Sequence, residues 1–258
     1  MRLLKLEKDG NVSLTDDLIE NIPQYAILSH TWGKPAEEVA YKDLLMANVV
    51  DSTKKPGYQK IKFCGEQAAR DKLDYFWVDT CCIDKSSSAE LSEAINCMFR
   101  WYRNAARCYV YLSDVQMKKR KSVKESSETT WEPAFRSSRW FTRGWTLQEL
   151  VAPIGVEFFS SEGERLGDKI SLQQTLHEIT GIAVTALQGY PLSQFSITER
   201  MSWAETRRTT REEDCAYSLL GIFNVQMPLV YGEGRKKALD RLREEIDKAL
   251  HGKTTTPS

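Results

Sequence analysis

The stretch that decides the fold is Tyr25-Ala26-Ile27-Leu28-Ser29-His30-Thr31-Trp32-Gly33, which joins an apolar run to a polar segment ending in glycine. An uninterrupted apolar run of this length is typical of a strand that is buried on both faces. The polar residues after it predict a loop at the carboxyl end of that strand. The same arrangement recurs at Tyr75-Phe76-Trp77-Val78, which Asp79 follows directly.

Helical patterns alternate with these strands. Residues 58–73 and 88–105 each carry apolar side chains at helical spacing, and residues 108–112 and 156–159 are two further apolar runs. A short helix is predicted over residues 144–151. Strands that alternate with helices predict an α/β fold, with an open parallel sheet and helices on both of its faces.

The flanking segments complete the predicted organisation. Residues 1–20 predict an N-terminal hairpin, because Asp9-Gly10 supplies the backbone angles of a tight turn. Residues 166–252 predict a helical extension of the 21–165 core. No linker rich in Gly, Ser or Pro separates the two parts, so residues 1–252 are expected to form one domain.

Three segments carry the capping-box pattern that starts a helix, at residues 87–90, 196–199 and 210–213. The charged residues 116–130 predict a long loop, which continues to about residue 140. A disordered tail is predicted for residues 253–258.

Composition limits the possible partners. Lys plus Arg and Asp plus Glu number 36 each, so bulk charge favours neither a nucleic acid nor a membrane surface. No apolar stretch has the roughly 20 residues that span a bilayer, and the N-terminus lacks the apolar core of a signal peptide. The six scattered cysteines indicate reduced thiols and a cytoplasmic location. No Cys-x-x-Cys pair is present, so no metal site is expected.

Polar clusters follow three of the predicted strands, at residues 29–33, 79–82 and 113–114. Ligands of open parallel sheets bind at the carboxyl ends of the strands, where such clusters meet. The short helix at residues 144–151 is expected to begin beside them. Its segment brings Arg143, Trp145 and Glu149 as further candidates.

Each candidate has a structural alternative. His30 could act as a base or fix the loop, and Trp32 could stack on a ligand ring or fill the core. Asp79 could serve the site or cap a turn. Cys82 could pair with His30 as a nucleophile, although small apolar packing is the default for cysteine. Glu149 lies in an apolar context, where a carboxylate is either ion-paired or functional.

Several blocks resemble the signature of the fungal heterokaryon-incompatibility (HET) domain. They are Tyr25-Ala26-Ile27-Leu28-Ser29-His30-Thr31-Trp32-Gly33, Trp77-Val78-Asp79-Thr80-Cys81-Cys82-Ile83-Asp84, Arg143-Gly144-Trp145-Thr146-Leu147-Gln148-Glu149-Leu150, Glu213-Asp214-Cys215-Ala216-Tyr217-Ser218-Leu219-Leu220-Gly221-Ile222 and Tyr231-Gly232-Glu233-Gly234. The resemblance covers roughly residues 1–250. It implies a death-inducing domain of fungal allorecognition and innate immunity, often fused to NACHT-type receptor regions.

Residues 25–160 are also similar, more distantly, to Toll/interleukin-1 receptor (TIR) domains, which implies a flavodoxin-like sheet. TIR enzymes cleave NAD with the glutamate of a Trp-Cys-x-x-Glu motif. Trp145 and Glu149 keep that spacing, one helical turn, which places both side chains on one face. Thr146 stands where the cysteine would be, and the segments 34–74 and 116–140 are longer than in a typical TIR domain.

The TIR similarity implies that Glu149 is catalytic and that NAD, or a related nucleotide, is the substrate. The implied substrate-binding residues are Ser29, His30, Trp32, Gly33, Asp79, Arg143 and Trp145. No Gly-x-Gly-x-x-Gly motif is present, so NAD would be consumed and no cofactor is expected.

Cleavage of the nicotinamide–ribose bond passes through an oxocarbenium-like state that one carboxylate can stabilise. Trp32 and Trp145 could stack on the pyridinium, and the fork of Arg143 suits a pyrophosphate. Self-association on activation is expected from the same resemblance. The alternative is a signalling module without enzymatic activity, which acts by homotypic assembly and recruitment.

Overall fold

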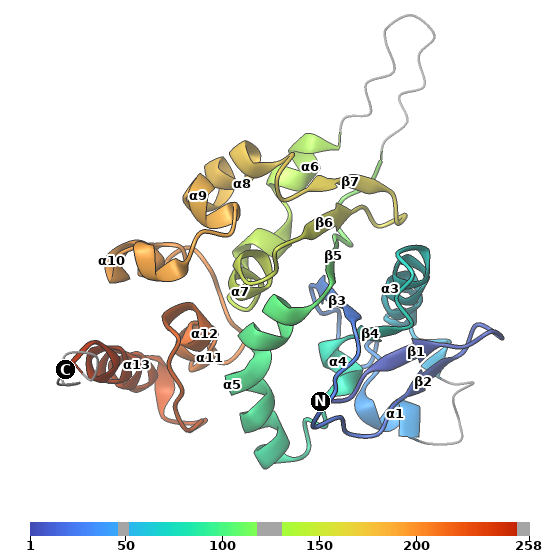
Figure 1. The fold of residues 1–258 in the computed structure, drawn as a ribbon, viewed down its shortest axis with the longest axis horizontal. Coiled ribbons are helices and arrows are strands. Elements are labelled where there is room, and N and C mark those ends of the chain that lie inside the picture. The colour runs from blue at the N-terminus through green and yellow to red at the C-terminus, as the bar shows by residue number, and fades with distance from the viewer. Residues whose placement is uncertain (46–51, 118–130, 252–258) are drawn as a thin grey trace, which may run out of the picture.

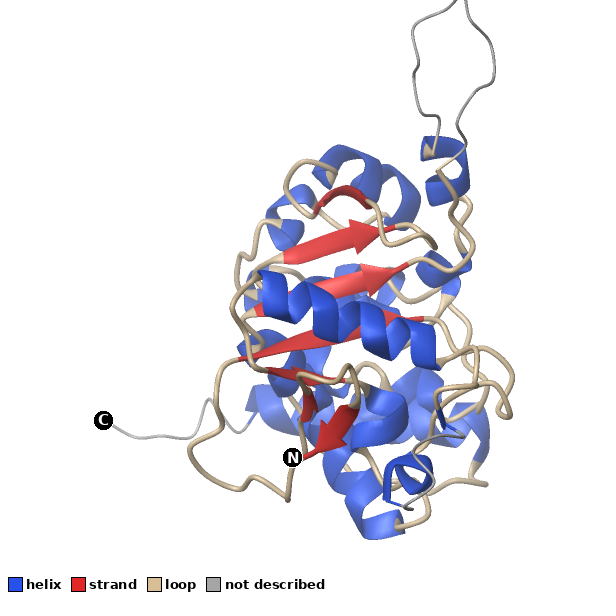
Figure 2. Ribbon diagram, turned by 90° about the vertical axis from the view of Figure 1, so that its right-hand side faces the viewer, coloured by secondary structure: helices blue, strands red, loops and turns tan. Residues whose placement is uncertain are grey.

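The structure is a computed structural model that describes residues 1–45, 52–117 and 131–251. These residues contain one seven-stranded sheet in the order β2-β1-β4-β3-β5-β6-β7 (Figures 1 and 2). The strands are β1 (Leu4–Leu6), β2 (Val12–Leu14), β3 (Tyr25–His30), β4 (Tyr75–Trp77), β5 (Arg107–Tyr111), β6 (Val156–Phe159) and β7 (Arg165–Asp168). The helices of the described residues are α1 (Tyr41–Leu45), α3 (Tyr58–Arg70), α4 (Asp79–Cys82), α5 (Ser88–Asn104), α6 (Glu132–Arg136), η1 (Arg139–Thr142, a 3₁₀ helix), α7 (Thr146–Val151), α8 (Gln173–Thr180), α9 (Val184–Leu187), η2 (Leu192–Gln194, also 3₁₀), α10 (Ile197–Ser202), α11 (Asp214–Tyr217), α12 (Leu220–Phe223) and α13 (Gly234–His251).

Four parallel strands form the middle of the sheet, in the order β4-β3-β5-β6. Counted along the chain from β3, they are strands two, one, three and four, which is the flavodoxin-like order. The predicted α/β class is therefore confirmed. The direction of winding reverses between β3 and β5, so the ligand crevice of such a sheet opens at the carboxyl ends of these two strands.

The two edges of the sheet are antiparallel additions to the predicted parallel sheet. The hairpin of β1 and β2 is confirmed, but β1 joins the sheet by pairing with β4 (Leu4 opposite Phe76). At the other edge β7 pairs with β6. The predicted helical extension thus begins inside a strand. Arg165-Leu166-Gly167-Asp168 carries no apolar run, so the sequence gives little sign of this edge strand.

Helices cover both faces of the parallel strands. Figure 1 shows α3 on one side of the sheet and α5 and α7 on the other. α3 contacts β1, β3, β4 and β5, while α7 contacts β3 and α5. All six residues of β3 are consequently buried. This central position explains the uninterrupted apolar run at its start.

Ser29 and His30 belong to β3, whereas the sequence predicts that they begin a loop. They pair with Val110 and Tyr111 of β5, so the strand continues two residues into the polar segment. Both side chains are buried, and each finds hydrogen-bond partners within the fold. Because neighbouring strand residues point to opposite faces, Ser29 and His30 enter different environments.

The long loop predicted at residues 116–140 is partly helical. Residues 118–130 and the predicted tail at 253–258 lie outside the described residues. From residue 132 the chain forms α6 and then η1, because Phe135 and Trp140 pack fully into the core. No helix in the described part of the chain is both long enough and apolar enough to span a bilayer.

Two of the three predicted helix caps are confirmed. The Ser87 hydroxyl accepts the Glu90 N–H at the start of α5 (3.3 Å), and Ser196 accepts the Glu199 N–H at the start of α10 (3.1 Å). These bonds satisfy backbone donors that the first turn of a helix leaves unpaired.

The third predicted cap, at residues 210–213, is wrong. α11 begins at Asp214 without a side-chain cap. The Thr210 hydroxyl instead accepts from Arg143 (3.0 Å). The Glu213 carboxylate accepts the N–H groups of Gly232 (2.8 Å) and Gly234 (3.0 Å), so it serves the start of α13.

Ser87→Ala should lower the free energy of unfolding by about 1 kcal/mol, because the first turn of α5 loses its side-chain acceptor. Urea denaturation followed by circular dichroism measures the change. Ser88→Ala is the matched control, since Ser88 is exposed and its side chain does not cap the helix. Equal effects of the two substitutions would contradict the capping role of Ser87.

The C-terminal helices pack on α5 and on one another. α12 contacts α5, and α11 contacts α13. Gly221 of α12 lies so close to Phe99 of α5 that a Cβ at position 221 would come within 2.0 Å of the Phe99 Cβ. This contact has no space for any larger residue at position 221.

Candidate active site

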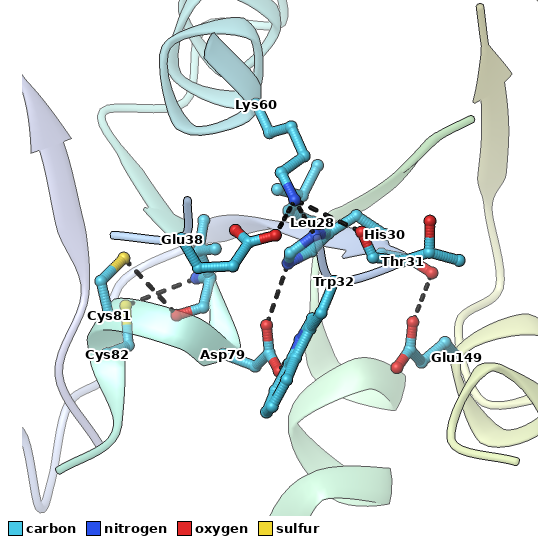
Figure 3. Close-up of polar contacts among 12 residues, drawn as sticks. Leu28, His30, Thr31, Trp32, Glu38, Lys60, Asp79, Cys81, Cys82 and Glu149 are labelled. Atoms are coloured by element: carbon cyan, nitrogen blue, oxygen red, sulfur yellow. Dashed lines mark hydrogen bonds and ion pairs between the residues drawn. The ribbon is translucent and has the colours of Figure 1, made fainter. Parts of the chain in front are cut away.

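Two polar clusters lie at the carboxyl end of β3, one built on Ser29 and one on His30. Figure 3 shows Lys60 and Asp79 around His30. The Ser29 hydroxyl donates a short hydrogen bond to the Glu149 carboxyl of α7. The Trp140 indole Nε1 donates to the same Ser29 oxygen (2.8 Å). Ser29 and Trp140 are fully buried, and Glu149 is only 7% exposed. Trp140 therefore fixes Ser29 in the orientation that binds Glu149.

Burial raises the pKa of Glu149 to about 8. The hydrogen bond from Ser29 opposes this rise, while the negative charge of Asp79 adds to it. At neutral pH most molecules consequently hold Glu149 in its protonated form. A carboxyl poised near neutral pH at the end of a central strand is typical of catalytic sites.

Buried cations hold both ends of α7, the helix that carries Glu149. At its start, the Arg207 Nη1 donates to the Thr146 hydroxyl and to the Arg143 carbonyl, each at 2.9 Å. At its end, the Lys169 ammonium donates to the carbonyls of Leu150 and Pro153. Burial lowers the pKa of Lys169 to about 8. These contacts fix the position of Glu149 against β3.

The His30 ring lies between Lys60 of α3 and Asp79 of α4 (Figure 3). Its Nδ1 is 3.0 Å from the Lys60 ammonium, and its Nε2 is 3.1 Å from the Asp79 carboxylate. An ammonium can only donate, so Nδ1 accepts and Nε2 carries the proton that it donates to Asp79. Since both ring nitrogens are engaged, this arrangement favours the structural alternative for His30.

Asp79 also accepts from the Trp32 indole Nε1 (2.9 Å), and the Lys85 ammonium lies 3.8 Å from its carboxylate. Burial would raise the pKa of Asp79, but Lys85, His30 and Trp32 together lower it to about 2. The Lys85 ammonium sits 3.7 Å above the Trp32 ring, which is half exposed. Trp32 is thus held by its edge and one face.

A second ion pair fixes the turn after β3. The Lys60 ammonium donates to the Glu38 carboxylate (2.5 Å) and to the Thr31 carbonyl (3.3 Å). Glu38 in turn accepts the Gly33 N–H (2.6 Å). The predicted polar loop over residues 31–33 is therefore held by hydrogen bonds from Lys60 and to Glu38.

A pocket of about 390 Å³ opens at this turn, over the carboxyl ends of β3 and β5. Its lining residues include Thr31, Trp32, Lys60, Ser113 and Arg139. This is the crevice where ligands of flavodoxin-like sheets bind, and its volume falls in the usual range of about 300–1,000 Å³ for small-molecule sites.

Two residues that line the pocket are near neighbours, along the chain, of residues in the buried Glu149 cluster. Thr31 lines the pocket and directly follows β3, two residues after Ser29. Arg139 lines the pocket and precedes Trp140, whose indole binds Ser29. Glu149 itself is not among the lining residues.

The structure divides the residues expected at the site among three places. Ser29 lies with Glu149, whereas His30, Trp32, Gly33 and Asp79 surround the turn beside the pocket.

Arg143 and Trp145 lie with the C-terminal part of the chain. The Arg143 Nη2 donates to Thr210 (3.0 Å), and the Trp145 Nε1 donates to Asp214 (3.2 Å). Neither residue lines the pocket at the end of β3. Thr146, which stands at the cysteine position of the TIR motif, uses its hydroxyl to donate to the Trp140 carbonyl (2.6 Å).

The proposed pair of His30 and Cys82 does not form. The His30 ring is engaged by Lys60 and Asp79, and the Cys82 sulfur accepts the Val78 N–H (3.4 Å). Cys82 is buried, as expected for the packing alternative.

Sequence reasoning missed Lys60, Trp140, Arg139 and Glu38. Lys60 gave a usable signal, because it lies four residues before Cys64 on the apolar stripe of α3. A lysine on a buried helix face needs an anionic or polar partner. Trp140 gave no local signal, since its contact with Ser29 spans 111 residues of chain.

The sequence of this chain is similar to that of known proteins. A family model described as "Heterokaryon incompatibility protein (HET)" matches residues 25–133. The vegetative incompatibility protein HET-E-1 of Podospora anserina is 58% identical over 249 residues, which cover 96% of this chain and 18% of that protein. The chain thus spans less than a fifth of the length of this relative. No solved structure matches the chain.

Proposed function

Because this chain belongs to the heterokaryon-incompatibility (HET) family, we propose that it is a cytoplasmic cell-death effector domain of fungal allorecognition that hydrolyses NAD. The observation that carries the proposal is the buried Glu149 carboxyl, which accepts from Ser29 near the end of the central strand while Trp140 fixes Ser29. The strand order and the place of α7 between β5 and β6 support the comparison with TIR enzymes.

The pocket suits a dinucleotide with a cationic ring. The exposed face of Trp32 can stack on a base or pyridinium ring, and Arg139 can contact the phosphates in the role expected of Arg143. Glu149 is buried and does not line this pocket, so the proposal requires that substrate binding bring the ribose of the nicotinamide half to the Glu149 carboxyl. The positive ring favours the ionised carboxylate, so substrate binding releases the Glu149 proton.

The reaction needs no external reductant or oxidant. The bond between C1′ and the ring nitrogen breaks, and its electron pair leaves with neutral nicotinamide. The carboxylate of Glu149 stabilises the positive charge that develops on the ribose. Water adds to C1′ and loses a proton, which gives ADP-ribose.

The test is incubation of the purified chain with NAD over a range of protein concentrations, with and without a crowding agent, because self-association is part of the proposal. Nicotinamide and ADP-ribose should appear in equal amounts. Their rate of formation should rise more than in proportion to the protein concentration. Light scattering identifies assembled samples. An assembled wild-type chain that releases no nicotinamide would overturn the proposal and favour the alternative of a recruitment module.

The pH profile gives a separate prediction. Nicotinamide release should rise about tenfold per pH unit below the pKa of Glu149, which is about 8, and then level off, because the ionised carboxylate is the active form. Initial rates at low NAD concentration, from about pH 6 to about pH 9, measure kcat/KM of the free protein. A profile that falls with rising pH would exclude the carboxylate as the active form.

A further inference from the structure

A second pocket, of about 340 Å³, lies apart from the proposed active site. It is lined by Arg207, Arg208, Thr209, Glu212 and Arg235. These residues come from the segment before α11 and from the start of α13. Three of these residues are arginines and one is a glutamate, so the lining residues carry two net positive charges.

Arg207 is the buried member of this set, with 6% of its surface exposed. Its Nε donates to the Trp203 carbonyl (3.1 Å), and its Nη1 donates to Arg143 and Thr146. Its Nη2 is buried and has no hydrogen-bond partner among the described residues. Burial lowers the pKa of Arg207 to about 10. The hydrogen-bond acceptors of Arg207 are neutral, and the anion that acts on its charge is Glu149, a carboxyl whose own pKa is raised to about 8. At neutral pH this buried cation is therefore only weakly compensated.

The first turn of α13 adds a second indication. Arg235, Lys236 and Lys237 occupy this turn, which contains no acidic residue. The positive end of the helix dipole lies there, so cations at this position destabilise the helix unless an anion is close. Glu213 supplies one negative charge by accepting the Gly232 and Gly234 N–H groups.

We propose that this pocket binds a phosphate group through Arg207, Arg208 and Arg235. A phosphate monoester carries a charge between −1.5 and −2 at neutral pH, which matches the two net positive charges of the lining. The planar fork of arginine pairs with two phosphate oxygens at once. The Thr209 hydroxyl can add a further donor. The volume accommodates inorganic phosphate or pyrophosphate.

The proposal does not rest on NAD cleavage, but it connects to the same helix. Arg207 binds Thr146 at the start of α7, and Glu149 lies in the same first turn. A phosphate that pairs with Arg207 consequently contacts the residue that positions α7.

Phosphate binding is measured by thermal unfolding in sodium phosphate, sodium pyrophosphate or sodium chloride at matched ionic strength and pH. We expect each phosphate to raise Tm by about 2–4 °C or more over chloride. Isothermal titration calorimetry should show one site per chain. The same Tm in phosphate and in chloride would overturn the proposal.

Arg208→Gln and Arg235→Gln should each weaken phosphate binding about tenfold, because each removes one charged donor from an exposed position. Arg243→Gln is the matched control, since it removes the same charge from α13 about two turns beyond the pocket. These exposed positions are preferred to Arg207, whose loss would also release Trp203 and Arg143. An undiminished phosphate response in the Arg208/Arg235 double variant would place the anion elsewhere.

Trp32→Ala separates this pocket from the proposed NAD site. Phosphate binding should be unchanged in that variant, whether or not the chain cleaves NAD. Loss of the phosphate response in Trp32→Ala would show that the anion occupies the pocket at the end of β3, and would overturn the proposal. ADP is the last ligand to be tested. If ADP binds more tightly than pyrophosphate, the ligand is a nucleotide. If the two bind equally, the pocket recognises the phosphate groups alone.

Discussion

Glu149→Gln should lower nicotinamide release by a factor of about 100 to 1,000, because the amide cannot supply the negative charge that stabilises the developing cation. The side chain keeps its shape, and its carbonyl oxygen can still accept the Ser29 hydroxyl. The loss should therefore appear in kcat/KM without loss of the fold. Nicotinamide release by purified protein measures it.

The same substitution should stabilise the folded chain in alkaline solution. The folded pKa of Glu149 is raised to about 8 from 4.5, so the folded state binds its proton more tightly than the unfolded state. Stability from this group is fully present below pH 4.5 and is lost as the pH rises to about 8. Glutamine does not titrate, so the variant escapes this loss, which is about 1.4 kcal/mol per pH unit at most.

Urea denaturation of both proteins across this pH range measures the difference in unfolding free energy. Glu205→Gln is the matched control, since it makes the same chemical change at an exposed position. It should alter neither activity nor the pH dependence of stability. A Glu149→Gln protein that is well folded and fully active would remove Glu149 from the reaction.

Gly221→Ala should destabilise the chain by about 1–3 kcal/mol or more, through overpacking between α12 and α5. In a helix, glycine to alanine normally stabilises by about 0.5–1 kcal/mol, so the sign is reversed here. The reason is the new Cβ, which would lie 2.0 Å from the Phe99 Cβ and 2.3 Å from its Cγ. Urea denaturation gives the change in unfolding free energy.

The partner of this contact offers an internal check. Phe99→Ala keeps its own Cβ, so it should rescue Gly221→Ala poorly, whereas Phe99→Gly removes the clash. Gly155→Ala is the control, because no atom lies within 4 Å of a Cβ at that position and its backbone is not left-handed. A Gly221→Ala protein as stable as the control would mean that the two helices can separate at little cost.

The parallel strands could be predicted because their sequences are governed by burial. Tyr25 to Leu28 is apolar throughout, since helices cover both faces of β3. The edge strand β7 was missed for the converse reason: Arg165 and Asp168 are paired with each other on the surface, and two polar residues of four mask the pattern. Burial leaves a local signature in sequence, whereas the pairing of β7 with β6 leaves none.

The candidate site could be predicted only in part, because its geometry depends on distant contacts. The sequence placed Ser29 and His30 in one loop, yet strand alternation sends Ser29 to Glu149 and His30 to Lys60. Spacing alone also grouped Trp145 with Glu149. The indole of Trp145 instead bonds to Asp214, a partner 69 residues away that no local pattern reveals.

The seven tryptophans differ sharply in their environments, and this gives the molecule a built-in optical probe. Trp77, Trp140 and Trp203 are fully enclosed, whereas Trp32, which is half exposed, is the most accessible of the seven. An aqueous quencher such as acrylamide should reach Trp32 far more readily than the others. Its red-shifted emission would then report entry of a ligand into the pocket in real time, without a label and independently of turnover.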